Sequence, residues 1–438
     1  MNKSLYIVAF SLAFATTGIA QNNEGQDKTV DLGTQTTTEL RKTQAVSTIY
    51  SDELDKNATT SPYNAIYGLL PGLTVMQNTS WGTDKSRLNV RGRGSLNGDT
   101  PLFVVDGFAR PIEYINLSEI ESISVLKDGA ATALWGGRGA NGVVLITTKR
   151  GMYSKKEIKV DYKFGLGLPV NQPEFADAYT YAKARNEALR YDGLQPDMDE
   201  ASFLAGGNSD LYPNVDWQKE ALRNHTTSHQ LDITFRGGGK RLRYFSVLNY
   251  KNDMGLLNSK YTDYTDRYNS QMKKYFLNLR MNLDVDITDA TKLKLNMLGM
   301  LRETKRPTTS EATLFEQIFN TPSAAFPVQT QNGLWGSNNV LKTNPIANLA
   351  DVGYYKLNQR MLQADLRLIQ DLSVLTRGLS AELAIAYDNN ATYQETAKKS
   401  FMYQTIEKGT DGEPVYTNYG NPNDELEISN KGLDNQYI

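Results

Sequence analysis

The feature that most constrains the fold is a long alternation of apolar and polar residues at positions 275–287. One set of alternate positions is apolar throughout, and the other is polar from Asn278 onward and includes Arg280 and Asp284. A period of two places each set on its own face of a β-strand. The run is also longer than the roughly five or six residues that are common in soluble sheets. It predicts a long strand with one apolar face and one charged face.

The same alternation recurs after residue 151, at positions 158–166, 231–235, 293–297, 362–368 and 379–385. A soluble β-sandwich with its apolar face turned inward gives the same pattern, and alternation alone leaves that alternative open. The strand length and the mid-strand charges favour a transmembrane barrel, because a charge on the lipid side at the membrane midplane costs about 2–4 kcal/mol. We therefore expect residues 152–438 to form the first part of an antiparallel β-barrel with a wet lumen.

Two long segments interrupt the predicted strands. Residues 171–217 include a helical pattern at 178–189, and residues 304–355 are rich in Pro, Asn and Thr. Outer-membrane barrels have short turns on one rim and longer loops on the other. We expect both segments to be extracellular loops.

Residues 45–151 have a different organisation. Short apolar runs are separated by glycine-rich turns, at positions 102–105, 122–126 and 142–148. Short helices are expected at 63–70 and 130–135, and the capping-box spacing at 118–121 predicts one further helical turn. Glu119 and Glu121 are interpreted as cap and surface residues. These features predict a compact α+β domain.

Composition excludes several classes of function. The chain has 438 residues with 47 basic and 49 acidic side chains, so its net charge of -2 gives no electrostatic footprint for nucleic acid. No cysteine is present, which excludes disulfides, thiolate metal sites and cysteine nucleophiles. At the N-terminus, Lys3 precedes an apolar run, and the small residues Gly18 and Ala20 follow it. Residues 1–20 are therefore predicted to be a signal peptide, since the run is shorter than the ~20 residues of a membrane anchor.

Two motifs that often mark cofactor sites are interpreted structurally. Gly137, Gly139 and Gly142 have the spacing of a dinucleotide-binding motif, which needs a strand before it and a helix after it. Here a predicted strand follows, so a tight turn is expected. His225 and His229 are four residues apart, but they begin a predicted strand and have no third ligand. No cofactor, metal ion or catalytic residue is predicted, and the chain is not expected to be an enzyme.

Several segments resemble the SusC/RagA family of TonB-linked outer-membrane receptors. The most specific are residues 124–129 (SVLKDG) and 135–148 (WGGRGANGVVLITT). Residues 212–217 (YPNVDW) and 343–349 (TNPIANL) are similar to barrel segments of the family. The resemblance implies a plug domain at 45–151, held inside a barrel.

The resemblance also implies TonB-dependent active import of a nutrient, an oligosaccharide or a peptide, across the outer membrane. The implied partners are the TonB complex of the inner membrane, a SusD-like surface lipoprotein, outer-membrane lipid and the glycan or peptide substrate. Residues 21–44 are expected to be a flexible tether. The positions on it that fit a TonB-contact segment, which pairs by adding a strand, are Thr29, Val30, Asp31, Leu32 and Gly33. A plain linker is the alternative for this segment.

The substrate-facing apex of the plug is expected near Trp81, Arg91, Arg93 and Tyr114. A plug of about 100 residues needs a barrel of roughly 22 strands, whereas the residues after 151 hold roughly seven to nine predicted strands. An unclosed sheet leaves an unpaired edge in lipid. We therefore expect the chain to be a truncated part of a longer protein.

Other functions remain open at this stage. The main alternative is a secreted β-rich protein that binds carbohydrate or peptide without a membrane role. A signalling receptor would need an additional N-terminal domain, and a passive porin would not need a plug.

Overall fold

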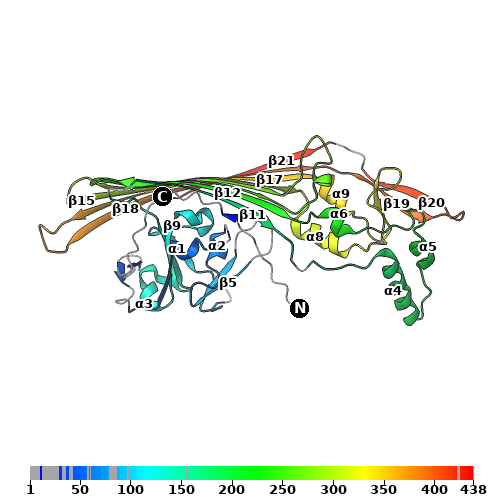
Figure 1. Ribbon diagram of the computed structural model, residues 1–438, viewed down its shortest axis with the longest axis horizontal. Helices are drawn as coiled ribbons and strands as arrows, with labels where there is room; N and C mark the ends of the chain where they lie inside the picture. Colours follow the sequence, from blue (N-terminus) through cyan, green and yellow to red (C-terminus); the bar gives the residue numbers. More distant parts are fainter. Residues whose placement is uncertain are drawn as a thin grey trace.

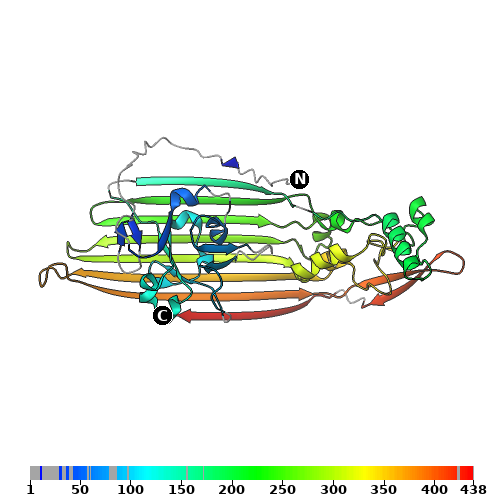
Figure 2. The same ribbon diagram turned by 90° about the horizontal axis from the view of Figure 1, so that it is seen from below.

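The computed structural model describes residues 10–11, 29–31, 36–38, 43–56, 59, 61–77, 86–95, 98–153, 156–170, 172–421 and 425–437. They form a small plug domain that lies against one face of a long antiparallel sheet, here called the wall (Figure 1). In the face-on view the plug covers the middle of the wall (Figure 2). Of the predicted signal peptide only Phe10 and Ser11 are described.

The plug is built on a five-stranded sheet in the order β4-β9-β10-β7-β8. Its strands are β4 (Val46–Tyr50), β7 (Leu102–Val105), β8 (Phe108–Ala109), β9 (Ile120–Leu126) and β10 (Val143–Thr148). A separate ribbon pairs β5 (Leu73–Met76) with β6 (Arg87–Val90). The core between sheet and helices is aliphatic, with Ile49, Ile66 and Ile123 almost fully buried. The predicted α+β domain is confirmed.

Short helices connect the plug strands. They are α1 (Ser51–Leu54), α2 (Pro62–Ala65), α3 (Gly129–Thr132), and the 3₁₀ turns η1 (Ile112–Tyr114), η2 (Leu117–Glu119) and η3 (Ala133–Gly139). Gly142 has a φ of 88°, and a Cβ there would lie 2.8 Å from the Val90 side chain. The turn interpretation of the glycine motif is therefore confirmed.

The helical turn predicted to start at Ser118 is wrong. The cap lies two residues earlier, where the Asn116 side chain accepts from the Ser118 amide at 3.1 Å. The Glu119 carboxylate in turn accepts from the Asn116 amide at 3.2 Å. Asn116 and Glu119 have capping-box spacing themselves, and the β-branched Ile120 already begins β9.

The wall contains eight long strands in the described residues, in the order β11-β12-β13-β14-β15-β17-β18-β21. They are β11 (Lys156–Gly167), β12 (Thr226–Gly238), β13 (Leu242–Met254), β14 (Lys273–Asp286), β15 (Thr291–Pro307), β17 (Gly353–Asp371), β18 (Ser380–Lys398) and β21 (Glu427–Tyr437). All neighbours pair antiparallel, and the two-residue β1 (Phe10–Ser11) pairs with β11. Among these residues the sheet is open and does not close on itself.

On the wall, the apolar side chains are exposed on the outer face and the polar side chains are buried on the face turned to the plug. Leu279 on the outer face is 49% exposed, whereas its neighbour Arg280, on the face turned to the plug, is 2% exposed. The same contrast holds along β14, where Leu277 is exposed while Asn278 and Asn282 are buried. A soluble sandwich would bury the leucines instead. The predicted barrel-type wall is thus confirmed.

The long connections all leave one rim of the wall (Figure 1). They carry α4 (Ala178–Tyr191), α5 (Glu200–Ala205), α6 (Trp217–Ala221), α7 (Ser259–Thr262), α8 (Glu311–Asn320), α9 (Pro345–Ala350), β16 (Trp335–Ser337), β19 (Met402–Lys408) and β20 (Pro414–Gly420). Helix α4 begins where Asp177 accepts from the Thr180 amide, which confirms the predicted helix there. In the described part of the chain no helix is both long and apolar enough to cross a membrane.

Candidate functional site at the plug–wall interface

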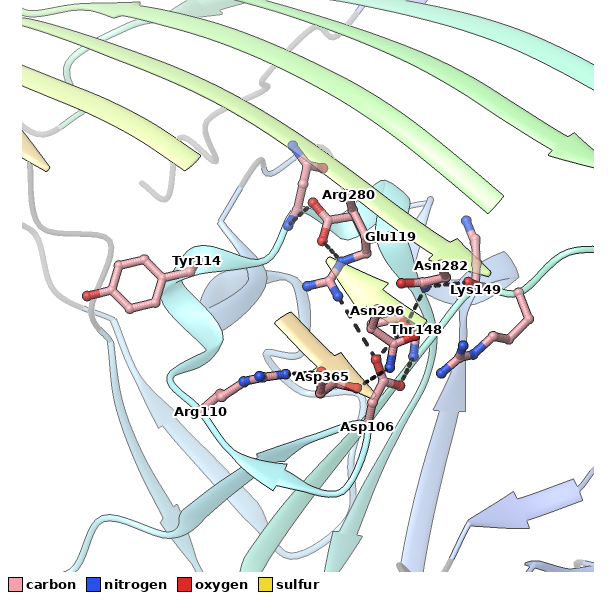
Figure 3. Close-up of polar contacts among 12 residues, drawn as sticks. Asp106, Arg110, Tyr114, Glu119, Thr148, Lys149, Arg280, Asn282, Asn296 and Asp365 are labelled. Atoms are coloured by element: carbon pink, nitrogen blue, oxygen red, sulfur yellow. Dashed lines mark hydrogen bonds and ion pairs between the residues drawn. The ribbon is translucent and has the colours of Figure 1, made fainter. Parts of the chain in front are cut away.

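A buried ion pair joins the plug to the middle of the wall. Glu119 closes η2, and its carboxylate accepts from Arg280 Nε of β14 at 2.5 Å. Asn278 of the same strand donates to the other carboxylate oxygen at 2.5 Å. Figure 3 shows the two charged side chains facing each other. Burial raises the pKa of Glu119, and the adjacent Arg280 opposes that shift. The ionised form of Glu119 completes the pair with Arg280.

A second plug residue, Arg110, binds two neighbouring wall strands. Its Nη1 donates to Asp365 of β17 at 2.5 Å, and its Nη2 donates to Asp388 of β18 at 2.7 Å. Asn296 of β15 donates to the remaining Asp365 oxygen at 2.6 Å. Arg110 is buried, so these bonds are formed away from water. The guanidinium fork suits such multiple recognition of carboxylates.

Asp106, in the turn between β7 and β8, lies beside the pair of Glu119 and Arg280. Its carboxylate accepts from the Thr148 amide and hydroxyl at 3.0 and 2.6 Å, and lies 4.0 Å from Arg280. Asn282 of β14 donates to the Thr148 hydroxyl at 2.8 Å, and Arg367 of β17 donates to the Asp106 carbonyl at 2.9 Å. Asp106 has a φ of 48°, in the left-handed region, which a β-turn at this point requires. The turn between β7 and β8 therefore has polar contacts with two wall strands, with β14 through Arg280 (Figure 3) and with β17 through Arg367.

Tyr114 lies at the end of this interface that is nearer the rim with the long loops. Its ring packs with Phe276, Leu298, Met300 and Met361 of the wall. The neighbouring Glu113 carbonyl accepts from Arg302 at 2.7 Å. Burial, with the nearby Glu113 carboxylate, raises the pKa of Tyr114 to about 12. The structure thus places this predicted apex residue against the wall.

The other predicted apex residues lie elsewhere. Arg93 and Arg87 both bind Asp99, at 3.1 and 2.8 Å, and Arg87 in particular lowers the pKa of Asp99. Arg91 follows β6 and has a φ of 59°. Trp81 is outside the described residues. Within the described contacts, nothing joins Arg91 or Arg93 to Tyr114.

The predicted TonB-contact segment is described in part. Thr29–Asp31 form β2, which pairs with β3 (Thr36–Thr38). Val30 is buried in a cluster with Val46, Val104 and Leu126 of the plug. Leu32 and Gly33 lie outside the described residues.

Sequence reasoning missed most of the interface. Glu119 is a cap residue as predicted, but its interpretation as a surface residue is wrong, because it is fully buried against Arg280. The position of Arg280 in the middle of a strand could have indicated this contact, because a charged side chain on the lumen face needs a polar partner. Arg110 carries no comparable local signal, because its partners Asp365 and Asp388 lie far along the chain.

Residues 38–143 match the family model of the TonB-dependent receptor plug domain. The TonB-dependent receptor P26 of Formosa agariphila is 28% identical over 281 residues, which cover 62% of this chain and 26% of that protein. The TonB-dependent receptor SusC of Bacteroides thetaiotaomicron is 30% identical over 255 residues, covering 55% of this chain and 24% of SusC.

Among solved structures, the RagAB peptide importer in its open-open state has a TM-score of 0.68 at 20% identity, covering 85% of this chain and 43% of that one. The chain thus spans about a quarter of the length of these two curated relatives, and less than half of the length of the solved RagAB chain. The resemblance drawn from the sequence is confirmed, and the matched relatives are receptors rather than enzymes.

Proposed function

We propose that this chain, which is SusC/RagA-like and carries the plug domain of a TonB-dependent receptor, supports active import of an oligosaccharide or a peptide. Receptors of this type are outer-membrane proteins, and the exposed leucines of the wall suit that environment. We further propose that the open wall belongs to a larger closed barrel, because an unpaired sheet edge is not tolerated in lipid.

The observation that carries the proposal is the pairing of an apolar outer face with a polar inner face that is occupied by the plug. Glu119 and Arg110 bind the inner face of β14, β17 and β18 through buried charges. A plug attached in this way blocks the lumen at rest. Passage of a solute then requires that these contacts be rearranged by work done on the plug.

The outer membrane holds no ion gradient, so we assign the source of that work to the TonB complex of the inner membrane. The proposed contact is the segment Thr29, Val30, Asp31, Leu32 and Gly33. Its described part already has strand geometry, which suits pairing with a partner strand.

We also propose a SusD-like lipoprotein as partner on the side of the long loops. The RagAB relative is a peptide importer, which supports peptide as one of the two substrate classes. The proposed substrate-facing residues of the plug are Trp81, Arg91, Arg93 and Tyr114.

The direct test is uptake by cells that carry or lack the gene, with radiolabelled peptides and oligosaccharides supplied in parallel. We expect one class to accumulate only when the gene is present and the inner membrane is energised. Equal uptake by the deletion strain, or uptake that persists without an energised inner membrane, would contradict the proposal.

The TonB contact can be tested with two matched proline variants. Asp31 and Thr36 face each other across the β2–β3 pair, so D31P and T36P disturb the same hairpin. We expect D31P to lower uptake and TonB cross-linking more than tenfold, because proline cannot donate to a partner strand. T36P should retain both. Equal effects of the two variants would contradict assignment of the contact to β2.

A further inference from the structure

We infer that the outer surface of the wall carries a binding site for the phosphate groups of a membrane lipid headgroup. The site is a row of three lysines, Lys273 of β14, Lys305 of β15 and Lys356 of β17, here called the lysine row. The inference rests on the proposed place of the wall in the outer membrane. It concerns the lipid-facing surface, which the transport function does not use.

The lysine row is fixed by strand register. Lys273 pairs with Lys305, and Lys305 pairs with Lys356, so the three side chains leave adjacent strands at one level. Adjacent strands are about 4.8 Å apart, and like charges directly opposite one another destabilise a sheet. An anion that bridges the ammonium groups would remove this repulsion.

All three lysines are on the outer face. Each is an even number of residues from an exposed outer leucine of its own strand: Leu277 for Lys273, Leu301 for Lys305, and Leu362 for Lys356. Residues two apart along a strand share a face. The lysine row therefore points away from the plug and the lumen.

The depth of the lysine row matches a headgroup. It lies toward the rim with the long loops, beyond the apolar positions that run along β14 from Leu277 to Val285. Two tyrosines on the same face flank the lysine row. Tyr275 is two residues from Lys273 on β14, toward the middle of the wall, and Tyr354 is two residues from Lys356 on β17, toward the rim with the long loops. Tyrosine girdles mark the membrane–water boundary in outer-membrane barrels. The lysines are thus at the level where lipid phosphates lie.

Two carboxylates adjoin the three lysines: Glu395 is directly opposite Lys356 in the strand register, and Glu303 is two residues from Lys305 on the same face of β15. Glu303 binds Lys356 at 3.2 Å, and Glu395 accepts from the Tyr354 hydroxyl at 2.8 Å. Lys305 Nζ lies 5.3 Å from the centre of the Tyr354 ring. Among the described residues no carboxylate is within ion-pair distance of Lys273 or Lys305. Two ammonium groups at one level therefore remain available to an anion.

An adjoining hollow favours a lipid over free phosphate. It has a volume of about 590 Å³ and lies toward the membrane middle from Lys356, lined on the outer face by Asn358, Arg360, Tyr393 and Gly432. Asp434 also lines it. A Cβ at Gly432 would meet nothing within 4 Å, so the floor of the hollow is open. An acyl chain can occupy this space while its headgroup reaches the lysines.

The test compares two triple variants of the full-length protein, purified in detergent from outer membranes. K273Q/K305Q/K356Q removes the lysine row, and K183Q/K219Q/K342Q removes three exposed lysines of the long loops as a matched control of net charge. The probe is bisphosphorylated lipid A, with its dephosphorylated form and inorganic phosphate as comparisons. Binding is measured by native mass spectrometry.

We expect the lysine-row variant to bind bisphosphorylated lipid A on the order of tenfold to a hundredfold more weakly than wild type, and the control variant to bind like wild type. Dephosphorylated lipid A should bind weakly to all three proteins, and inorganic phosphate should not compete. Undiminished binding by the lysine-row variant, equal binding of dephosphorylated lipid A, or competition by inorganic phosphate would each overturn the inference. Recovery of the wild-type protein outside the membrane fraction would instead overturn the proposed function on which the inference rests.

Discussion

At the scale of single residues, the ion pair between Glu119 and Arg280 makes the sharpest prediction. E119A leaves Arg280 buried, with the Asp106 carboxylate 4.0 Å away as its nearest acid. Removing one member of a buried pair costs about 3–5 kcal/mol, because the other charge is left uncompensated. We expect E119A to lower the free energy of plug release by about that amount, measured by trypsin cleavage of the plug at increasing urea concentrations.

The neighbouring Glu121 supplies the control. Its side chain is half exposed, and it lies 3.9 Å from Arg236, a geometry worth at most about 1 kcal/mol. E121A should therefore release the plug at nearly the wild-type urea concentration. Similar shifts in the two variants would show that the charge on Glu119 does not hold the plug in place.

Asp99 predicts how the plug responds to acid. Arg87 and Arg93 bind its carboxylate and lower its pKa below the ordinary value of 3.8. When folding lowers the pKa of a carboxylate, its charged form stabilises the folded state at any pH above the unfolded-state pKa. That stability is lost as the pH falls through the folded-state pKa, because the carboxylate becomes protonated. Wild-type plug should thus lose more stability than D99N below about pH 4. The measurement is urea unfolding across that range, with D55N, an exposed plug aspartate, as control. Parallel profiles for wild type and D99N would contradict the prediction.

At the scale of elements, β14 predicts where a charge is tolerated. Leu279 points outward from the middle of the apolar band, and an arginine there costs about 2–4 kcal/mol in lipid. We expect L279R to reduce the amount of folded protein in the outer membrane. Leu204 of α5 is 67% exposed in a loop, so L204R makes the same exchange without contact with lipid and should leave that amount unchanged. The comparison is made by immunoblot of fractionated membranes, and equal losses would argue against a lipid-facing surface.

The strands that could be predicted from sequence are those whose two faces differ in polarity along their whole length. β14 is such a strand. β13 (Leu242–Met254) escaped prediction because Phe245 and Val247 are buried on its inner face and interrupt the polar set. That face is recognisable only once Asn249 is seen to donate to Ser118 of the plug at 2.8 Å. Where plug-facing positions of a wall strand are apolar, as Phe245 and Val247 are, the alternation of apolar and polar residues is interrupted.

The candidate site was less predictable than the fold for a related reason. The mid-strand position of Arg280 indicates a polar environment but does not identify Glu119 as its partner. The contacts of Arg110 with Asp365 and Asp388 depend on how the plug is seated against the wall, and no local spacing encodes that arrangement. Cap residues such as Asn116 act within a few positions, so the short elements that carry the contacts can be predicted more easily than the contacts themselves.

At the scale of the whole molecule, the two rims of the wall predict opposite exposure to the cell exterior. The chain has no cysteine, so a single introduced cysteine reports one position. Tyr191, at the end of α4, is 91% exposed on the rim with long loops, and Lys240 is exposed in the short turn between β12 and β13 on the other rim. We expect a membrane-impermeant maleimide to label Y191C on intact cells and K240C only after the outer membrane is permeabilised. Long loops facing outward would place the proposed inner-membrane partner on the side of the short turns. Labelling of K240C but not Y191C on intact cells would indicate the opposite orientation. Labelling of both positions on intact cells would contradict a membrane barrier between the two rims.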